Sequence, residues 1–400
     1  MRFPEFSGEW NKYTINDLAT VVGGGTPDTT VKSYWGGDIQ WFTPSEIGKN
    51  KYVDFSKRTI TRDGLDNSSA KLLPLHTILL SSRATVGECS IASNECTTNQ
   101  GFQSLIAKQC NIDFLYYLIQ TKKKDLIRNA CGSTFLEISA NEIRKIKVAV
   151  PVQNEQEQIA KLLSLIDERI ATQNKIIEDL KKLKSAIAET LFCTPKESMP
   201  AKRVSPYNKE WKLIKLSDIC QRVQTKNTGN QCRQVLTIAA QHGLVNQEDF
   251  FNKTVASENL EGYYLLQKGD FAYNKSYSGG YTWGAIKRLE WYDKGVLSPL
   301  YICFRPDSSK VNADFLAHYF ESKKWHKGIA DIAGEGARNH GLLNISVIDF
   351  FNTIHRIPDL DEQKDIARIL NSLSSKLSCE QRVIQNLTMQ RSYLLHKMFI

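Results

Sequence analysis

The chain contains two copies of one long segment. Residues 136–192 and 343–399 align without a gap, and the alignment places Pro151 on Pro358 at an offset of 207 residues. The repeats of solenoid proteins are only about 20–50 residues long. The offset therefore predicts the tandem duplication of a whole domain together with one long helix.

Apolar residues follow a heptad pattern in each copy. They recur at alternating steps of four and three residues over about five heptads, which is typical of the narrow seam of a coiled coil. Either segment alone would also fit an amphipathic core helix. Because both seams are interrupted at the same two layers, we predict that the helices pair with each other or with helices of a partner. The predicted interface consists of Ile159, Leu163, Ile166, Ile170, Ile177, Leu180, Lys184, Ile187, Ile366, Leu370, Leu373, Leu377, Glu380, Ile384, Leu387 and Leu394.

Polar residues within the seams predict the orientation of the helices. Gln173 and Lys184 interrupt the first seam, and Glu380 and Arg391 interrupt the second. An antiparallel pair can place Lys184 against Glu380 and Gln173 against Arg391, whereas a parallel pair in register would stack two cations. These residues therefore favour an antiparallel coiled coil, unless they point to solvent or contact a partner subunit.

The composition indicates a globular protein. The 400 residues, 41% hydrophobic and 24% charged, suffice for about two to three domains. No stretch approaches the roughly 18 apolar residues of a transmembrane helix, and the N-terminus lacks the apolar core of a signal peptide. Nine cysteines without a CxxC pair are expected to be small buried side chains in a reducing compartment. We therefore predict a cytoplasmic protein without zinc or disulfide bonds.

The positive net charge is concentrated outside the two heptad segments. The chain carries a net charge of +9, whereas residues 153–198 contribute about −1 and residues 359–400 about +1. Basic globular domains indicate a polyanionic partner, of which nucleic acid is the commonest. A mildly basic solvated surface would give the same count.

Each half of the chain follows the same order of segments. A tryptophan, Trp10 or Trp211, precedes a short helical stretch, and β-rich segments follow. Each half then enters a helix for which Asp113 or Asp314 is the predicted capping residue. The predicted fold class is α/β, with two duplicated globular domains that alternate with two long helices. The predicted boundaries are residues 1–150 and 199–357 for the globular domains and residues 151–198 and 358–400 for the helices.

Several motifs resemble those of a known family. The first half contains Gly-Gly-Gly-Thr-Pro at residues 23–27 and Ser-Arg-Ala-Thr-Val-Gly at residues 82–87. Both halves contain a proline followed by a Glu-Gln pair, at residues 155–156 and 362–363, that opens the heptad helix. On these motifs the chain resembles, over essentially its full length, the specificity subunit of type I restriction–modification enzymes. It departs from the pattern at residues 224–229, where Gln-Thr-Lys-Asn-Thr-Gly stands in place of the glycine-rich run.

The resemblance implies a function in DNA recognition. Two target recognition domains would each read one half of a bipartite double-stranded DNA site, with the helices as an antiparallel spacer. Two methyltransferase subunits would dock on this chain, and translocating nuclease subunits would join them. The assembled complex would methylate adenine and restrict unmodified DNA. The resemblance places S-adenosylmethionine, ATP and Mg²⁺ in the partner subunits and no cofactor in this chain. The departure in the second half implies that the two domains read different sequences.

Candidate DNA contacts are polar side chains in loops that follow strand-like segments. Arginine, lysine, asparagine and hydroxyl groups recognise base edges in the major groove, whereas contacts to phosphates position a protein without reading sequence. The alternative for each residue is a solvated charge or a local salt bridge. The predicted base-reading residues are Arg83, Thr85, Lys275, Tyr277, Arg338, Asn339 and His340. The predicted phosphate contacts are Lys49, Lys51, Arg58, Arg62 and Lys71.

The chain lacks the common sequence motifs of an enzyme active site. It contains no GxxxxGK(S/T) nucleotide loop, no HExxH metal site and no Asn/Asp-Pro-Pro-aromatic motif for an extruded base. We therefore predict a non-catalytic subunit. Two alternatives remain open: a fused nuclease or methylase with an unrecognised site, which would be active as a purified chain, and a coiled-coil adaptor that binds proteins, which would lack salt-sensitive DNA binding.

Overall fold

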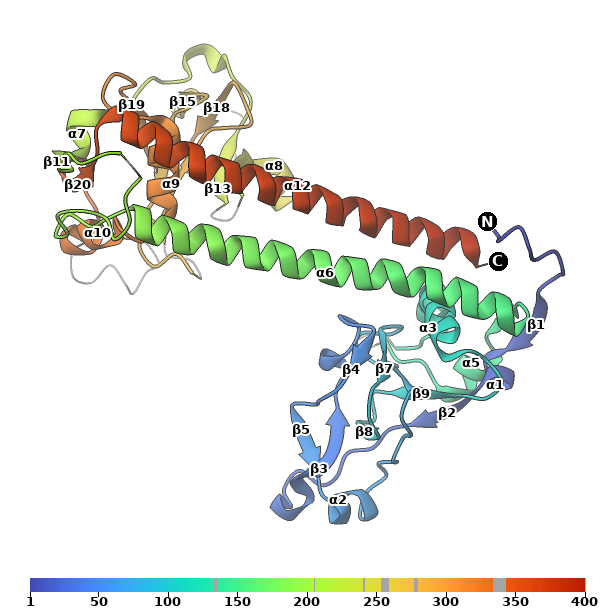
Figure 1. Ribbon diagram of the computed structural model, residues 1–400. Coiled ribbons are helices and arrows are strands. Elements are labelled where there is room, and N and C mark those ends of the chain that lie inside the picture. The colour runs from blue at the N-terminus through green and yellow to red at the C-terminus, as the bar shows by residue number, and fades with distance from the viewer. Residues whose placement is uncertain are drawn as a thin grey trace. The chain divides into compact units, whose positions relative to one another are not determined.

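The structure is a computed structural model that divides into two compact units (Figure 1). It describes residues 1–132, 136–204, 206–239, 242–252, 259–276, 280–333 and 343–399. The first unit consists of Met1–Lys175 and Arg382–Ile400, and the second of Ile176–Gln381. Each unit therefore contains one α/β globule and parts of both long helices.

The first unit is built around a five-stranded sheet with the strand order β2-β9-β6-β7-β4, beside a three-stranded sheet with the order β5-β3-β8. Its strands are β1 (Asn11–Thr14), β2 (Ala19–Gly23), β3 (Trp35–Phe42), β4 (Tyr52–Val53), β5 (Arg58–Ile60), β6 (Ile78–Leu80), β7 (Cys89–Ala92), β8 (Cys96–Thr98), β9 (Gln103–Ala107) and β10 (Lys147–Val150). Its helices are α1 (Ile15–Leu18), η1 (Lys32–Tyr34), η2 (Pro44–Glu46), α2 (Arg62–Asp66), α3 (Ile112–Thr121), α4 (Lys123–Arg128), α5 (Ala140–Lys145) and the first part of α6 (Gln153–Leu191).

The core of the first unit lies between the larger sheet and α3. Strand β6 is completely buried because β9 and β7 flank it in the middle of the sheet. Helix α3 packs Phe114 and Leu115 into the same core. The antiparallel pair β1–β10 aligns Asn11 with Val150, so that the chain enters α6 directly from this core.

The second unit repeats this plan with additional strands. Its strands are β11 (Lys212–Lys215), β12 (Cys220–Arg222), β13 (Leu236–Ala239), β14 (Gly243–Asn246), β15 (Tyr264–Gln267), β16 (Phe271–Asn274), β17 (Ala285–Arg288), β18 (Lys294–Leu297), β19 (Ile302–Pro306) and β20 (Ile354–Ile357). Its helices are α7 (Leu216–Ile219), η3 (Thr228–Asn230), α8 (Gln247–Phe251), α9 (Ala313–Glu321), α10 (His326–Ile332), α11 (Val347–Phe351) and the first part of α12 (Leu360–Met398).

The duplication predicted from the sequence is visible in the sheet topology. The order β12-β19-β16-β17 in the second unit matches β2-β9-β6-β7 in the first, and the pair β11–β20 matches β1–β10. The predicted α/β class and the two long helices are confirmed, since α6 and α12 each have 39 residues.

The capping residues of α3 and α9 differ from the prediction. Asn111 and Asn312 cap these helices, because their side chains accept hydrogen bonds from the amides of Phe114 (3.0 Å) and Phe315 (2.9 Å). The predicted caps Asp113 and Asp314 lie inside the first turn, where their carboxylates form ion pairs with Lys51 and Arg288. An acidic residue after an Asn cap can be mistaken for the cap, because both favour the first turn of a helix.

Within each unit, one end of α6 shares a core with the opposite end of α12. In the first unit Ile159 and Leu163 of α6 belong to the same buried cluster as Leu394 of α12. In the second unit Leu191 of α6 shares a cluster with Leu370 of α12. The residues of the predicted seam are buried or partly buried along both helices. An antiparallel pair requires this order of ends, and a coiled coil over the whole length remains a prediction.

The polar seam residues have ion-pair partners within their own units. Lys184 lies 2.9 Å from the carboxylate of Glu321 at the end of α9, and Glu380 pairs with Lys376 one turn earlier on α12. Arg391 forms an ion pair with Asp167. The predicted contact between Lys184 and Glu380 remains a prediction, which a double-mutant cycle on the two residues would decide.

Candidate nucleic-acid interface

Arg83 lies in a tight turn between β6 and β7, as the sequence predicted. The amide of Ser81 donates to the carbonyl of Glu88 (2.8 Å), and the amide of Gly87 donates back to Ser81 (3.0 Å). Ala84 and Gly87 have φ angles of 63° and 88°, which belong to the left-handed region. A Cβ atom on Gly87 would also lie 2.8 Å from the side chain of Lys123. The turn is therefore closely constrained by its backbone.

The guanidinium group of Arg83 binds Glu137, which the sequence reading missed. Its Nε and Nη2 atoms donate to Oε2 of Glu137 at 3.0 and 2.6 Å. The two side chains remain 46% and 41% exposed. A backbone bridge joins the same two residues, and the amide of Ile138 donates to Ser82. The pair therefore lies on the surface on two backbone segments that hold each other in place.

Two further segments support this turn. The amide of Ser82 donates to the carbonyl of Gly101 (2.8 Å), and the exposed Thr85 has its hydroxyl 3.0 Å from that of Ser81. In the glycine-rich run, a Cβ atom on Gly24 would lie 2.0 Å from the carbonyl oxygen of Asn99. This glycine is therefore required for close packing against Thr98 and Asn99.

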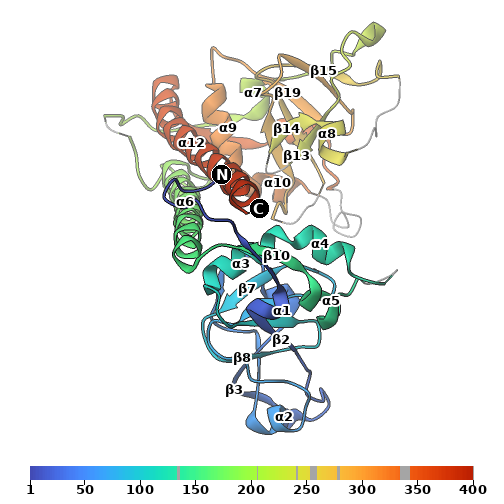
Figure 2. The same cartoon turned by 90° about the vertical axis from the view of Figure 1, so that its right-hand side faces the viewer.

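Four of the five predicted phosphate contacts have exposed side chains. Lys49 and Lys71 are exposed, and Arg62 forms only a surface ion pair with Asp66. Arg58 is exposed and stacks its guanidinium group over Trp35, 3.6 Å from the ring centroid. In Figure 1, β3, β5 and α2 form the end of the first unit that lies away from α6, and Figure 2 shows the same for β3 and α2. Arg58 in β5 and Arg62 in α2 are at this end, whereas Arg83 is in the turn between β6 and β7 of the larger sheet.

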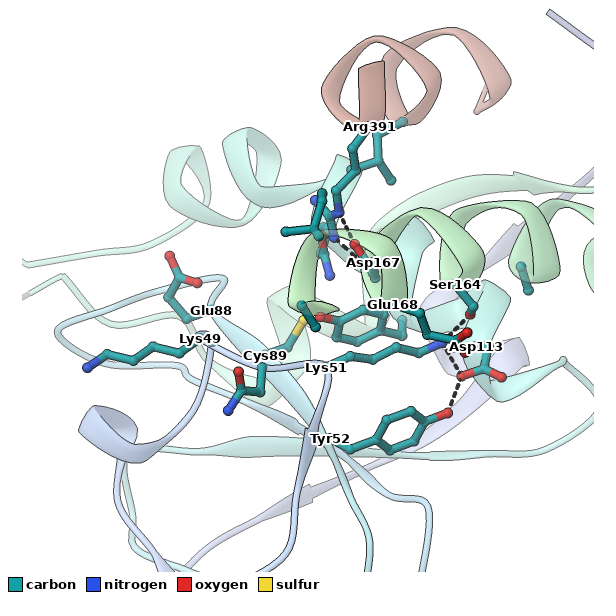
Figure 3. A pocket seen from close by; sticks show the side chains of 18 of the residues that line it. Lys49, Lys51, Tyr52, Glu88, Cys89, Asp113, Ser164, Asp167, Glu168 and Arg391 are labelled. Carbon is teal, nitrogen blue, oxygen red and sulfur yellow. Dashed lines mark hydrogen bonds and ion pairs between the residues drawn. The ribbon is translucent and has the colours of Figure 1, made fainter. Parts of the chain in front are cut away.

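Lys51 has a structural role that its sequence context did not reveal. Only 10% of its side chain is exposed, and its ammonium group lies 2.7 Å from Asp113 and 2.6 Å from the hydroxyl of Ser164 on α6 (Figure 3). The hydroxyl of Tyr52 also donates to Asp113 at 2.8 Å. These contacts leave the ammonium group little access to a phosphate, so we correct the predicted DNA contact at Lys51 to a link between the globule and α6.

These residues line a pocket of about 1030 Å³ in the first unit (Figure 3). Arg391 and Asp167 form an ion pair at one side of the pocket, and the hydroxyl of Tyr117 donates to Asp167 at 2.7 Å. Burial raises the pKa of Tyr117 above its usual range. The charged groups of the pocket largely neutralise one another. Within the described parts of the chain, no cluster of histidine, cysteine and acidic side chains could hold a metal ion.

One predicted base-reading residue of the second unit, Lys275, lies within the described residues. Lys275 is the first residue after β16, as Ser81 is after β6, and its Nζ lies 3.4 Å from the carbonyl of Ile345. Gly284 has a φ angle of 76° and closes this loop as Gly87 closes the first. The other predicted residues of this half, Tyr277, Arg338, Asn339 and His340, lie outside the described residues.

The Glu-Gln pairs join each long helix to its globule. Gln156 accepts from the amide of Asn111 (3.0 Å) and donates to the carbonyl of Pro151 (2.9 Å). Gln363 repeats both bonds, to Asn312 and Pro358, at 2.8 Å each. The motif is therefore a structural joint.

Each glutamate of the motif binds an arginine that the sequence reading did not select. Arg2 donates two hydrogen bonds of 2.7 Å to the buried Glu155, and Arg203 donates two of 2.8 Å to the buried Glu362. In both halves the arginine stands eight residues before the tryptophan that opens the globule. This repeated spacing is the sequence pattern that could have identified both arginines.

The cysteines agree with an expectation from composition. Seven of the nine cysteines are buried, and burial raises the pKa of Cys89 and Cys96 to about 12, which leaves both thiols protonated. In the part of the chain that the structure describes, no helix has the length and apolar character needed to cross a membrane.

Comparisons with known proteins identify the family. The family model "Type I restriction modification DNA specificity domain" matches residues 7–182 and again 208–389. The MjaIX specificity subunit of Methanocaldococcus jannaschii is 38% identical over 192 residues, which are 46% of this chain and 44% of that protein. The chain thus aligns with less than half the length of this relative.

Other relatives match over most of their length. The EcoprrI specificity subunit of Escherichia coli is 22% identical over 92% of this chain and 88% of that protein. The crystal structure of a type I S subunit from M. genitalium has the same fold, with a TM-score of 0.59 and 19% identity over 100% of this chain and 99% of that chain. The resemblance found in the sequence is confirmed: with two specificity domains that cover most of its length, the chain belongs to the type I restriction–modification DNA specificity family.

Proposed function

We propose that the chain is a non-catalytic DNA-specificity subunit that reads a bipartite double-stranded site. The observation that carries the proposal is that one scaffold occurs twice with different loops. The loop between β6 and β7 has eight residues (81–88), whereas the loop that replaces it in the second unit, between β16 and β17, has ten (275–284) and a different sequence. Loops on a rigid scaffold commonly carry recognition. Two different loops would read two different half-sites.

The long helices would set the distance between the half-sites. A helix of 39 residues is about 58 Å long at 1.5 Å per residue, whereas one turn of duplex DNA is roughly 34 Å. Domains at opposite ends of an antiparallel pair would therefore leave several base pairs unread between them.

The helices would also dock methyltransferase subunits. Leu165 and Leu183 on α6 are 54% and 48% exposed, and Met389 and Tyr393 on α12 are 63% and 55% exposed. Met389 and Tyr393 are one turn apart on α12, so their exposed side chains are neighbours on one face of the helix, and we assign this face to a protein interface. In this proposal the partners bind S-adenosylmethionine, ATP and Mg²⁺, nuclease subunits join the complex in the cytoplasm, and this chain binds no cofactor.

Methylome sequencing of cells that express the chain with its methyltransferase partner would test the proposal. We expect one bipartite motif with a fixed spacer, methylated on adenine. A control culture that expresses the methyltransferase alone should lack the motif. Methylation or cleavage by the purified chain without partners would overturn the non-catalytic assignment, and an absence of salt-sensitive DNA binding by the complex would favour an adaptor that binds proteins.

A further inference from the structure

The Arg83–Glu137 pair leaves hydrogen-bonding groups available on both side chains. Both bonds from Arg83 end on the same oxygen, Oε2 of Glu137. Across the described ranges, neither Nη1 of Arg83 nor Oε1 of Glu137 has a hydrogen-bond partner. The pair therefore presents donors and an acceptor side by side on the surface.

Several of the described residues that flank the pair have small side chains. Ala84, Thr85, Cys131 and Gly132, which flank the two residues, are small and exposed. The turn is fixed by its left-handed residues and by the bridge to Glu137, so both side chains extend from a constrained backbone. A site that is preorganised in this way loses little conformational entropy when it binds.

The charge of the pair disfavours a phosphate as its ligand. A carboxylate beside the guanidinium group repels an anion at short range and cancels much of the attraction of the arginine. The edge of a base pair carries no net charge and presents both acceptors and donors. A neutral Arg–Glu pair therefore matches a base edge better than the backbone of DNA.

We propose that Arg83 and Glu137 together read two adjacent base pairs in the first half-site, an inference that rests on the proposed function. Arg83 donates to O6 and N7 of a guanine in one pair, and Glu137 accepts from the N4 amino group of a cytosine in the adjacent pair. A carboxylate favours cytosine over adenine, because adenine presents the acceptor N7 beside its amino group. Glu137 thereby becomes a specificity-determining residue.

The test uses the complex of the full chain with its methyltransferase partner. Glu137→Ala and Glu137→Gln would be compared with wild type for binding to duplexes randomised in the first half-site and for the methylated motif in cells. We expect both variants to keep the guanine preference and to lose about tenfold discrimination at the cytosine position. Arg83→Ala should lose the guanine preference, and the second half-site should be unchanged in every variant.

A matched control is Glu142→Gln, which breaks the exposed ion pair with Lys145 in the same unit and should leave the motif unchanged. Uniform weakening or strengthening on all sequences by the Glu137 variants would overturn the inference, because it would indicate a structural or purely electrostatic role. Glu137→Gln keeps the size of the side chain, so it decides the question if Glu137→Ala is unstable. A wild-type complex without sequence preference would overturn the proposed function itself.

Discussion

Replacing Gln363 with leucine should strongly destabilise the second unit. The side chain is 1% exposed and satisfies two backbone groups at 2.8 Å, the amide of Asn312 and the carbonyl of Pro358. Leucine has a similar volume but forms no hydrogen bond, so both groups lose their partner without a large cavity. A buried polar group without a partner costs about 1–3 kcal/mol. Because the amide of Asn312 is only partly buried, we expect a loss of roughly 2–4 kcal/mol in the free energy of unfolding.

Urea denaturation of the full chain, followed by circular dichroism, would measure this loss. Hydrogen exchange would locate it, because the amides of β20 and of the first turns of α12 should lose protection. Gln381→Leu is the matched control, since it lies exposed on the same helix and should change stability by less than about 0.5 kcal/mol. A loss below about 1 kcal/mol for Gln363→Leu would refute the assignment of the motif as a structural joint.

Three further predictions follow from the structure. Arg203→Ala should lower the free energy of unfolding by about 3 kcal/mol, because it leaves the buried carboxylate of Glu362 without its partner. In urea denaturation, the double variant with methionine at positions 203 and 362 should recover most of this loss. A double variant as unstable as Arg203→Ala would contradict the role of the buried charge. Burial lowers the pKa of His355 from 6.5 to about 4, so that on acidification the unfolded state takes up a proton before the folded state does. The free energy of unfolding should therefore fall by about 3 kcal/mol as the pH decreases from 6.5 to 4. His355→Gln should flatten this dependence, and an unchanged profile would exclude His355 as its cause. Exchange of residues 1–150 for the matching domain of a relative should change only one half-site in the methylome, and a change in both half-sites would disprove modular recognition.

The part of the candidate site that could be predicted is the part set by local sequence. The position of Arg83 between small residues after a strand predicts an exposed loop, and the structure places it exposed in a tight turn. Its partner Glu137 is 54 residues away, and no local pattern connects the two. Lys51 also follows a loop, but Asp113 and Ser164 bury its ammonium group. Exposure of a lysine depends on which distant segments pack around it, so its role could not be predicted.

The sequence by itself determined the duplication, the α/β class and the two long helices. These features depend on periodic apolar patterns and on repeated motifs, which can be recognised in the sequence without knowledge of the tertiary structure. Only the tertiary structure decided the strand order, the buried partners of Glu155 and Glu362, and the pairing of Arg83 with Glu137. Such contacts form between segments that are far apart in the chain, and the free energy of burying a polar group selects them only after the core has brought those segments together.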